Sequence, residues 1–148
     1  MPYVLATSSS PSFVMKGLTG YAFQPLKDPD VAVHFVDVHK GHDTYMISKA
    51  LTRLYYIIQG TGVFTIENQK YDVVAGMLVE MPPGVEYSYS GSMKVLLVSH
   101  PRWFEGNEHT TRKNPEVVGE SGMVRNIGER LLRYLRRLRG KKARLHHK

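Results

Sequence analysis

Short stretches of alternating apolar and polar residues run along the chain from about residue 13 to residue 99. Residues 31–38, 54–58 and 95–99 are rich in β-branched and aromatic side chains, which is typical of strands. Turn-forming residues separate such stretches at intervals of about 8–12 residues, and a helical spacing of apolar residues does not begin before about residue 125. The pattern predicts an all-β domain, either a sandwich or a barrel.

Glycine-rich and polar segments are expected to turn the chain between these strands. Residues 59–62, Gln-Gly-Thr-Gly, predict a hairpin turn because glycine accepts positive φ angles. Gly91 and the Pro-Pro-Gly segment at 82–84 predict further turns. Residues 103–119 carry no strand pattern, so we expect a polar connector that either wraps over the barrel through an aromatic anchor or stays exposed.

The C-terminal segment differs from the rest of the chain in pattern and in charge. Residues 123–148 carry a net charge of +9, whereas residues 1–122 carry −2. Apolar residues recur from Ile127 to Leu138 at i, i+4, i+8 and i+11 among arginines, which predicts a basic amphipathic helix. We expect this helix to pack on the barrel or on a partner subunit, with peripheral membrane contact as an alternative. No nucleic-acid-binding motif accompanies the charge, so binding to nucleic acid is not expected.

Composition narrows the class of protein further. A chain of 148 residues is expected to form one main domain, here residues 1–104, followed by a connector at 105–122 and the basic tail. The chain has no cysteine, which excludes disulfides and thiolate metal sites. Because the N-terminus lacks a signal-peptide pattern and no apolar run approaches about 20 residues, we expect a cytoplasmic protein.

Two glycine-framed blocks organise the middle of the chain. They read Gly41-HDTYM-Ile47-Ser48-Lys49-ALT-Arg53-LYYIIQ-Gly60 and Gly76-MLVEM-Pro82-Pro83-Gly84-VE-Tyr87-SYS-Gly91. The spacing of glycines and prolines resembles the two motifs of the cupin superfamily. Where those motifs carry metal-binding His, His, Glu and His, this sequence has Ile47, Lys49, Arg53 and Tyr87. The resemblance implies a single-domain jelly-roll β-barrel that has lost its metal ligands, so neither a metal nor a cofactor is expected.

The resemblance places the substituted positions at the mouth of the barrel. Lys49, Arg53 and Tyr87 are therefore expected to converge there, and alternation along the strands adds Tyr55 and Tyr89 as ligand-binding residues. Two cations and a phenol suit an anion, such as a carboxylate, a phosphate or the pyrophosphate of a nucleotide sugar, better than a divalent metal.

Structural roles are the alternative for each of these residues. Arg53 pairs internally with Glu80 or Glu86 in one alternative, and Lys49 reaches from the rim into solvent in another. The tyrosines are equally compatible with packing in the core or capping the barrel mouth.

Histidines supply the candidate general bases. His34 and His100 are the candidates to face the pocket and act near neutral pH, with Tyr87 as the acid. His39 and His42 share a turn and are expected to be solvated.

Three hypotheses for function follow. The first is a metal-free cupin that binds a small anionic or sugar-type ligand in the barrel mouth. The second, implied by the resemblance, is an isomerase similar to nucleotide-sugar epimerases and ketoisomerases, acting through tyrosine and histidine. The third is a dimeric scaffold targeted by its basic tail. In each case the resemblance implies a homodimer.

Overall fold

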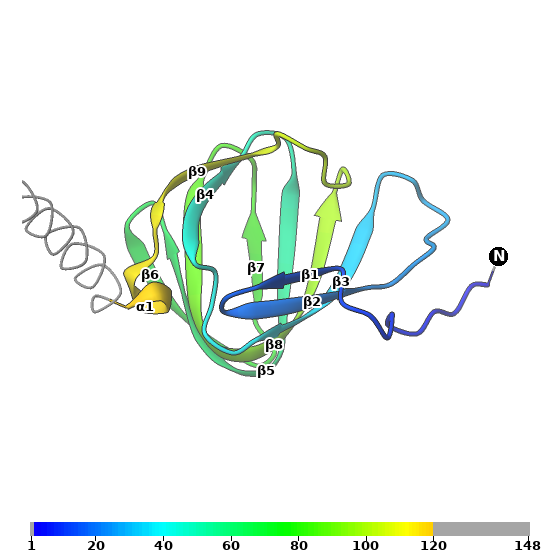
Figure 1. Cartoon of the computed structure of the whole chain (residues 1–148), viewed down its shortest axis with the longest axis horizontal. Helices are drawn as coiled ribbons and strands as arrows, with labels where there is room; N and C mark the ends of the chain where they lie inside the picture. The colour runs from blue at the N-terminus through cyan, green and yellow to red at the C-terminus, as the bar shows by residue number, and fades with distance from the viewer. Residues whose placement is uncertain (1, 120–148) are drawn as a thin grey trace, which may run out of the picture. The chain divides into compact units, whose positions relative to one another are not determined.

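The computed structural model describes residues 2–119. Two compact units divide the chain, Met1–Val117 and Val118–Lys148, and both the sheet and the candidate site lie in the first. The elements are β1 (Phe13–Met15), β2 (Leu18–Ala22), β3 (Ala32–Val38), β4 (Thr44–Ser48), β5 (Thr52–Ile66), β6 (Gln69–Val74), β7 (Leu78–Met81), β8 (Glu86–His100), β9 (Glu108–Lys113) and the short helix α1 (Pro115–Val118). The predicted all-β barrel is confirmed (Figure 1).

All nine strands of the described chain belong to one curled sheet (Figure 1). The main path runs β1-β2-β3-β8-β4-β9, and β5 pairs with β6, β7 and β8. The long strands β5 and β8 pair antiparallel along almost their whole length, from Thr52↔His100 to Ile66↔Tyr87. They therefore connect the strands paired with β8 to those paired with β5. Because the sheet curls, side chains from strands far apart in the sequence face one interior.

The two long strands bend where the sequence predicted turns. The hairpin turn expected at residues 59–62 and the turn expected at Gly91 are wrong, because β5 and β8 continue through them. Gly62 and Gly91 are in register, and a Cβ on Gly91 would lie 2.5 Å from the Cα of Gly62. Glycine therefore permits a close approach of two bent strands here, which is a common role of glycine inside a sheet.

Tight turns join the other strands. The chain reverses from β5 into β6 at Glu67 and Asn68, whose φ angles are 49° and 65°. Asparagine accepts this left-handed backbone better than most residues. The turn predicted at residues 82–84 is present before β8, with Gly84 at a φ of 82°.

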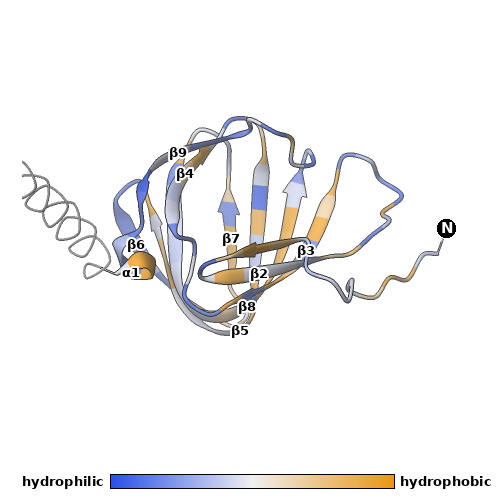
Figure 2. Ribbon diagram, in the orientation of Figure 1, coloured by the Kyte–Doolittle hydropathy of each residue, from blue (hydrophilic) through white to orange (hydrophobic). Residues whose placement is uncertain are grey.

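Alternation along β5 separates the interior from the outer surface. Arg53, Tyr55 and Ile57 are buried, whereas Tyr56 and Ile58 are exposed. Figure 2 shows apolar and polar bands following one another along the strands. The largest fully buried side chains include Tyr87, Phe64, Leu18, Leu51, Ile57 and Met81. Burial of each large apolar side chain contributes about 1.5–3 kcal/mol, so this cluster provides a rigid floor for the interior.

Strand β9 lies where the sequence predicted a polar connector. It pairs with β4 from Ser48↔Glu108 to Thr44↔Lys113, with an irregularity between Tyr45 and Met46. Its side chains are almost all exposed, so no apolar alternation marks it in the sequence. Backbone hydrogen bonding holds this strand, helped by the Arg112 guanidinium, which lies 3.6 Å from the Tyr45 ring centroid.

The predicted basic helix in residues 123–148 lies outside the described residues. Within the described part, α1 is the last element. No described helix has the length and apolar character needed to cross a membrane.

Candidate functional site

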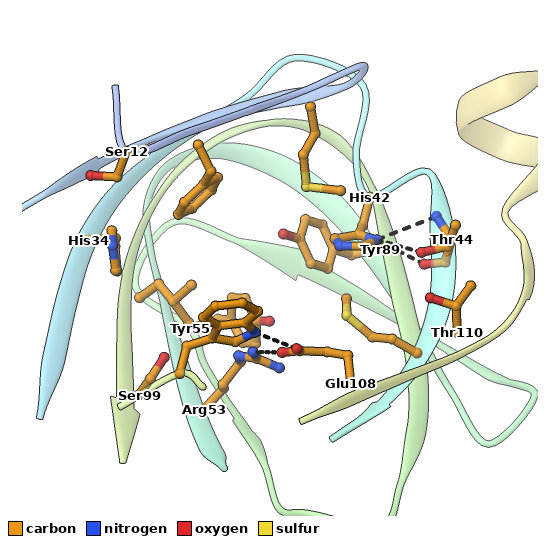
Figure 3. A pocket seen from close by; sticks show the side chains of 15 residues that line it. Ser12, His34, His42, Thr44, Arg53, Tyr55, Tyr89, Ser99, Glu108 and Thr110 are labelled. Atoms are coloured by element: carbon orange, nitrogen blue, oxygen red, sulfur yellow. Dashed lines mark hydrogen bonds and ion pairs between the residues drawn. The ribbon is translucent and has the colours of Figure 1, made fainter. Parts of the chain in front are cut away.

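The curled sheet encloses a cavity of about 640 Å³ (Figure 3). Side chains from β1, β3, β4, β5, β8 and β9 line it, together with three loop residues: Ser12 before β1, His42 after β3 and Trp103 after β8. The lining residues are Ser12, Phe13, Met15, His34, His42, Thr44, Met46, Arg53, Tyr55, Tyr89, Leu97, Ser99, Trp103, Glu108 and Thr110. A largely apolar wall with a few convergent polar groups is the usual character of a small-molecule site.

A salt bridge between Arg53 and Glu108 lies along one side of the cavity. Arg53 points inward from β5, and its Nη2 donates to Glu108 Oε1 from the start of β9. Trp103 Nε1 donates to the other carboxylate oxygen, and Asn107 Nδ2 donates to Oε1 at 3.2 Å. Although partial burial alone would raise the pKa of Glu108, the hydrogen bonds from Arg53 and Trp103 lower it, so the group is a carboxylate at neutral pH.

Glu108 is a functional candidate that the sequence interpretation missed. The expected partners of Arg53 were Glu80 and Glu86, but Glu80 is exposed and Glu86 accepts bonds from Thr111 and Arg112. Nothing in the local sequence distinguishes Glu108, because β9 carries no apolar pattern and its pairing with β4 spans about sixty residues of chain.

The salt bridge also changes the expected electrostatics. Arg53 and Glu108 are the two lining residues that are always charged near neutral pH, and they neutralise each other. The predicted excess of positive charge in the mouth is therefore absent among the lining residues. Such a cavity suits an uncharged polar ligand better than an anion.

Three tyrosines of β5 and β8 lie beside the salt bridge. The hydroxyl oxygens of Tyr55 and Tyr87 are 2.6 Å apart, and Arg53 Nη1 donates to the Tyr87 hydroxyl at 3.5 Å. Tyr55 and Tyr89 line the cavity, whereas Tyr87 is fully buried behind them. Tyr87, expected as ligand-binding residue and acid, is therefore placed as a support for Arg53 and Tyr55.

Burial sets the protonation state of these phenols. Burial raises the pKa of Tyr55, Tyr87 and Tyr89 above the ordinary tyrosine value. All three are neutral hydrogen-bond donors at physiological pH. Tyr89 stacks on Phe64 with ring centroids 4.9 Å apart, which fixes the direction of its hydroxyl.

His42 lies in the cavity, contrary to the expectation that it would be solvated. Its Nδ1 is 2.9 Å from the backbone oxygen of Thr44, and its ring meets the Tyr89 ring edge-on at 5.9 Å. Thr44 N also lies 3.3 Å from Nδ1, but the shorter contact is to the carbonyl oxygen, which only accepts. We therefore assign the proton to Nδ1, which leaves Nε2 with a free lone pair. Figure 3 shows Nε2 directed away from Thr44, toward the cavity.

The environment keeps His42 neutral. Desolvation lowers its pKa below 6.5, and this outweighs the opposing effects of the Thr44 carbonyl and the Asp43 carboxylate. A neutral imidazole held through Nδ1, with a free Nε2, is the arrangement of a general base. The sequence feature that could have indicated the inward position of His42 is the preceding glycine. Gly41 has a φ of 136°, and His42 N donates a hydrogen bond to the Tyr89 carbonyl oxygen at 2.9 Å.

His34 reaches the cavity, but Lys49 and His100 do not, and neither does Tyr87 as described above. His34 lines the wall at β3, in register with Leu97. Lys49 is exposed because β4 ends at Ser48 and the alternation that would turn its side chain inward stops there. His100 is exposed because Leu97 and Ser99 occupy the inward positions of β8. The expected convergence of Lys49 with Arg53 is thus corrected.

The described residues contain no evident metal site. Among residues 2–119, no three side chains of His, Cys, Asp or Glu type are grouped so as to hold a metal ion. Arg53 and Tyr87 occupy two positions at which the cupin motifs carry metal ligands, and neither is a ligand type that a divalent metal prefers.

Comparisons with known proteins agree with this fold. Residues 40–92 match the family model of the AraC-like ligand binding domain. No curated protein matches the chain significantly. A structure of Streptomyces Pac13 (H42Q) with uridine is 26% identical with a TM-score of 0.71, covering 78% of this chain and 96% of that one. Pac13 is described as a nucleoside dehydratase in a structure that is 25% identical, with a TM-score of 0.69 and the same coverage.

A more distant structure extends the comparison. KdgF from Halomonas sp. is 17% identical with a TM-score of 0.56, covering 64% of this chain and 87% of that one, and it supports the fold alone. The Pac13 structures with uridine carry the substitutions H42Q, Y55F and Y89F, which name the same residue types and numbers as three lining residues of this chain. By its motifs, its curled sheet and these comparisons, the chain has a cupin-type fold, and residues 40–92 are similar to an AraC-like ligand binding domain.

Proposed function

We propose that the cavity binds a nucleoside-type molecule, a sugar joined to a planar base, and that the chain acts on the sugar by acid–base chemistry. The observation that carries this proposal is the presence of His42, Tyr55 and Tyr89 in one cavity, matching the three substitutions in the uridine-containing structures of Pac13. The proposal keeps the sugar-type ligand predicted from the sequence and replaces the anionic ligand by an uncharged one.

His42 is the base in this proposal. Its Nε2 takes a proton from a sugar carbon whose C–H bond is acidified by a neighbouring carbonyl group. The electron pair of that bond forms a carbon–carbon double bond, and the C–O bond on the next carbon breaks. The departing hydroxide receives the proton from the imidazolium and leaves as water. The step is a dehydration, and it returns His42 to its neutral form without a further reagent.

Tyr89 and the salt bridge hold the substrate during this step. The Tyr89 hydroxyl donates a hydrogen bond to the oxygen on which negative charge develops, and burial keeps it protonated for that purpose. Glu108 remains a carboxylate and accepts hydrogen bonds from sugar hydroxyls, while Arg53 balances its charge. Trp103 covers the salt bridge from the loop after β8.

An epimerase or isomerase is the second candidate function. Its first step is also removal of a proton from a sugar carbon, and the fixed orientation of His42 by Thr44 favours it equally. The two candidates differ in the fate of the carbanion. Epimerisation returns a proton to the same carbon, whereas dehydration expels the neighbouring hydroxyl.

Binding is the first test of the proposal. Uridine should raise the thermal midpoint of the protein in proportion to the logarithm of its concentration. Glu108→Gln should weaken this response, and Lys49→Ala, an exposed matched control, should leave it unchanged. A wild-type midpoint that uridine, cytidine and adenosine all fail to move would contradict the proposal.

The reaction is the second test. A nucleoside with a carbonyl in its sugar is incubated with the protein in deuterium oxide and followed by NMR and mass spectrometry. Dehydration gives a product lighter by one water, whereas epimerisation gives deuterium at one carbon with the composition otherwise unchanged. Absence of both products with a bound substrate would contradict the assignment of His42 as a base.

A further inference from the structure

The cavity has two chemically different ends. His42, Thr44 and Thr110 lie at one end, with Arg53 and Glu108 beside them (Figure 3). Ser12, His34 and Ser99 lie at the opposite end, which we call the neutral end. Arg53 lies next to Ser99 between the two ends, and its charge is balanced by Glu108 (Figure 3). The proposed chemistry uses the first end and leaves the second without a role.

His34 has an unsatisfied polar atom at the neutral end. Its Nδ1 is buried and has no hydrogen-bond partner among residues 2–119. An unpaired buried nitrogen of this kind is uncommon in a native protein and is destabilising unless another molecule satisfies it. The ring is neutral near pH 7 because burial lowers the pKa of His34, so it offers one donor and one acceptor.

Two hydroxyl groups lie on either side of His34 in the lining. Ser99 is 5% exposed and stands opposite Arg53 in the pairing of β8 with β5. Ser12 Oγ already accepts a hydrogen bond from Ala22 N at 3.1 Å, so its own proton is available for donation. Together these groups present hydroxyl donors next to a neutral imidazole.

An aromatic ring accompanies these polar groups. The Phe13 and His34 ring centroids are 5.3 Å apart. Gly20 permits this placement, because a Cβ at Gly20 would lie 2.0 Å from the Phe13 ring. The neutral end thus combines a flat apolar surface with a short row of hydrogen-bonding groups. The charged group next to it, Arg53, is paired with Glu108.

We propose that the neutral end recognises the planar base of the nucleoside, with His34, Ser12 and Ser99 pairing to its edge and Phe13 packing on its ring. The inference rests on the proposed nucleoside ligand and assigns its orientation: the base lies at the neutral end and the sugar lies between Glu108 and His42. Ser12 donates to a ring carbonyl, and a nitrogen of His34 accepts from the neighbouring ring N–H. A base whose N–H is flanked by carbonyls, as in uracil, fits this pattern better than cytosine, whose ring nitrogen is an acceptor.

Affinities for uridine and cytidine test the assignment. Dissociation constants are measured by calorimetry for the wild type, His34→Leu, Ser99→Ala and the exposed control His100→Ala. We expect His34→Leu and Ser99→Ala each to weaken uridine binding by about tenfold, the effect of one lost hydrogen bond in a buried site. The ratio of uridine to cytidine affinity should fall toward one in these variants and stay at the wild-type value in His100→Ala.

The experiment separates this inference from the proposed function. If the wild type binds no nucleoside, both fail. If the wild type binds uridine and Glu108→Gln weakens it while His34→Leu and Ser99→Ala do not, the nucleoside ligand stands and the neutral end is not its base subsite. Leucine leaves no unpaired nitrogen at position 34, so we expect that variant to fold, and thermal unfolding without ligand checks this.

Discussion

His34 and His42 face the same cavity from opposite sides, and their surroundings differ in one decisive respect. Burial lowers the pKa of both, so both are neutral near pH 7. The Thr44 carbonyl holds His42 through Nδ1 and thereby directs Nε2 into the cavity, whereas His34 Nδ1 has no partner in the described chain. The comparison supports His42 as the base, because a hydrogen bond to Nδ1 orients its other nitrogen toward the substrate. It supports His34 as a binding group, because its Nδ1 is free to pair with a ligand.

Replacing each histidine by glutamine gives the largest expected difference. Glutamine keeps hydrogen-bonding capacity but cannot take a proton, so His42→Gln should lower the rate of substrate deprotonation by about 10²–10⁴-fold, the usual contribution of a general base. His34→Gln should act mainly on KM. Steady-state kinetics with the carbonyl nucleoside measure both. Equal losses of kcat in the two variants would remove the distinction between the histidines.

The backbone that positions His42 gives the next largest effect. Gly41→Ala places a Cβ about 2.2 Å from the Tyr89 carbonyl oxygen at a φ of 136°, so the strands must separate and His42 must move. Gly76→Ala is the matched control, because its φ of 91° is also positive but no atom lies within 4 Å.

Stability and activity report on this pair of variants separately. The left-handed conformation alone costs a non-glycine residue about 1–2 kcal/mol, which is the loss expected for Gly76→Ala in urea unfolding. Gly41→Ala should lose more, and it should also lose activity. Similar unfolding free energies for the two variants would show that the close approach at Gly41 does not position His42.

The pH dependence of stability gives the smallest effect. A histidine whose pKa is lowered by folding takes up its proton more readily in the unfolded chain, so the free energy of unfolding falls as pH drops below about 6.5. We expect this slope between pH 6.5 and pH 5, above the range in which Glu108 titrates. His34→Leu and His42→Gln should each flatten it, as measured by urea unfolding at several pH values. A slope that neither substitution changes would place the titrating group elsewhere.

Strand patterning and motif spacing were sufficient to predict the fold class and several of the residues that line the cavity. The all-β barrel followed from short alternating stretches, and the cupin resemblance followed from the glycine and proline frame. Arg53 and Tyr55, two apart on β5, face the interior because alternate strand residues share a face. Tyr89 and His34 reach the same cavity for the same reason.

The errors arose where a residue's position depends on something other than its own strand. The glycines at 60, 62 and 91 favour turns by local preference, but the pairing of β5 with β8 outweighs that preference and uses them for a bend. Lys49 was assigned inward from its motif position, but it follows the end of β4. His100 was a candidate base, but it alternates with the inward residues Leu97 and Ser99 and is therefore exposed.

Sequence alone determined which faces of the strands are apolar and where glycine must stand, because these properties depend on neighbours one or two residues away. Only the tertiary structure decided that Glu108 meets Arg53, that the Thr44 carbonyl orients His42, and that His34 is left with a free nitrogen. The physical reason is that local spacing sets which way a side chain points, while the partner it finds, and therefore its protonation and chemistry, depends on chain segments that meet only when the sheet curls closed.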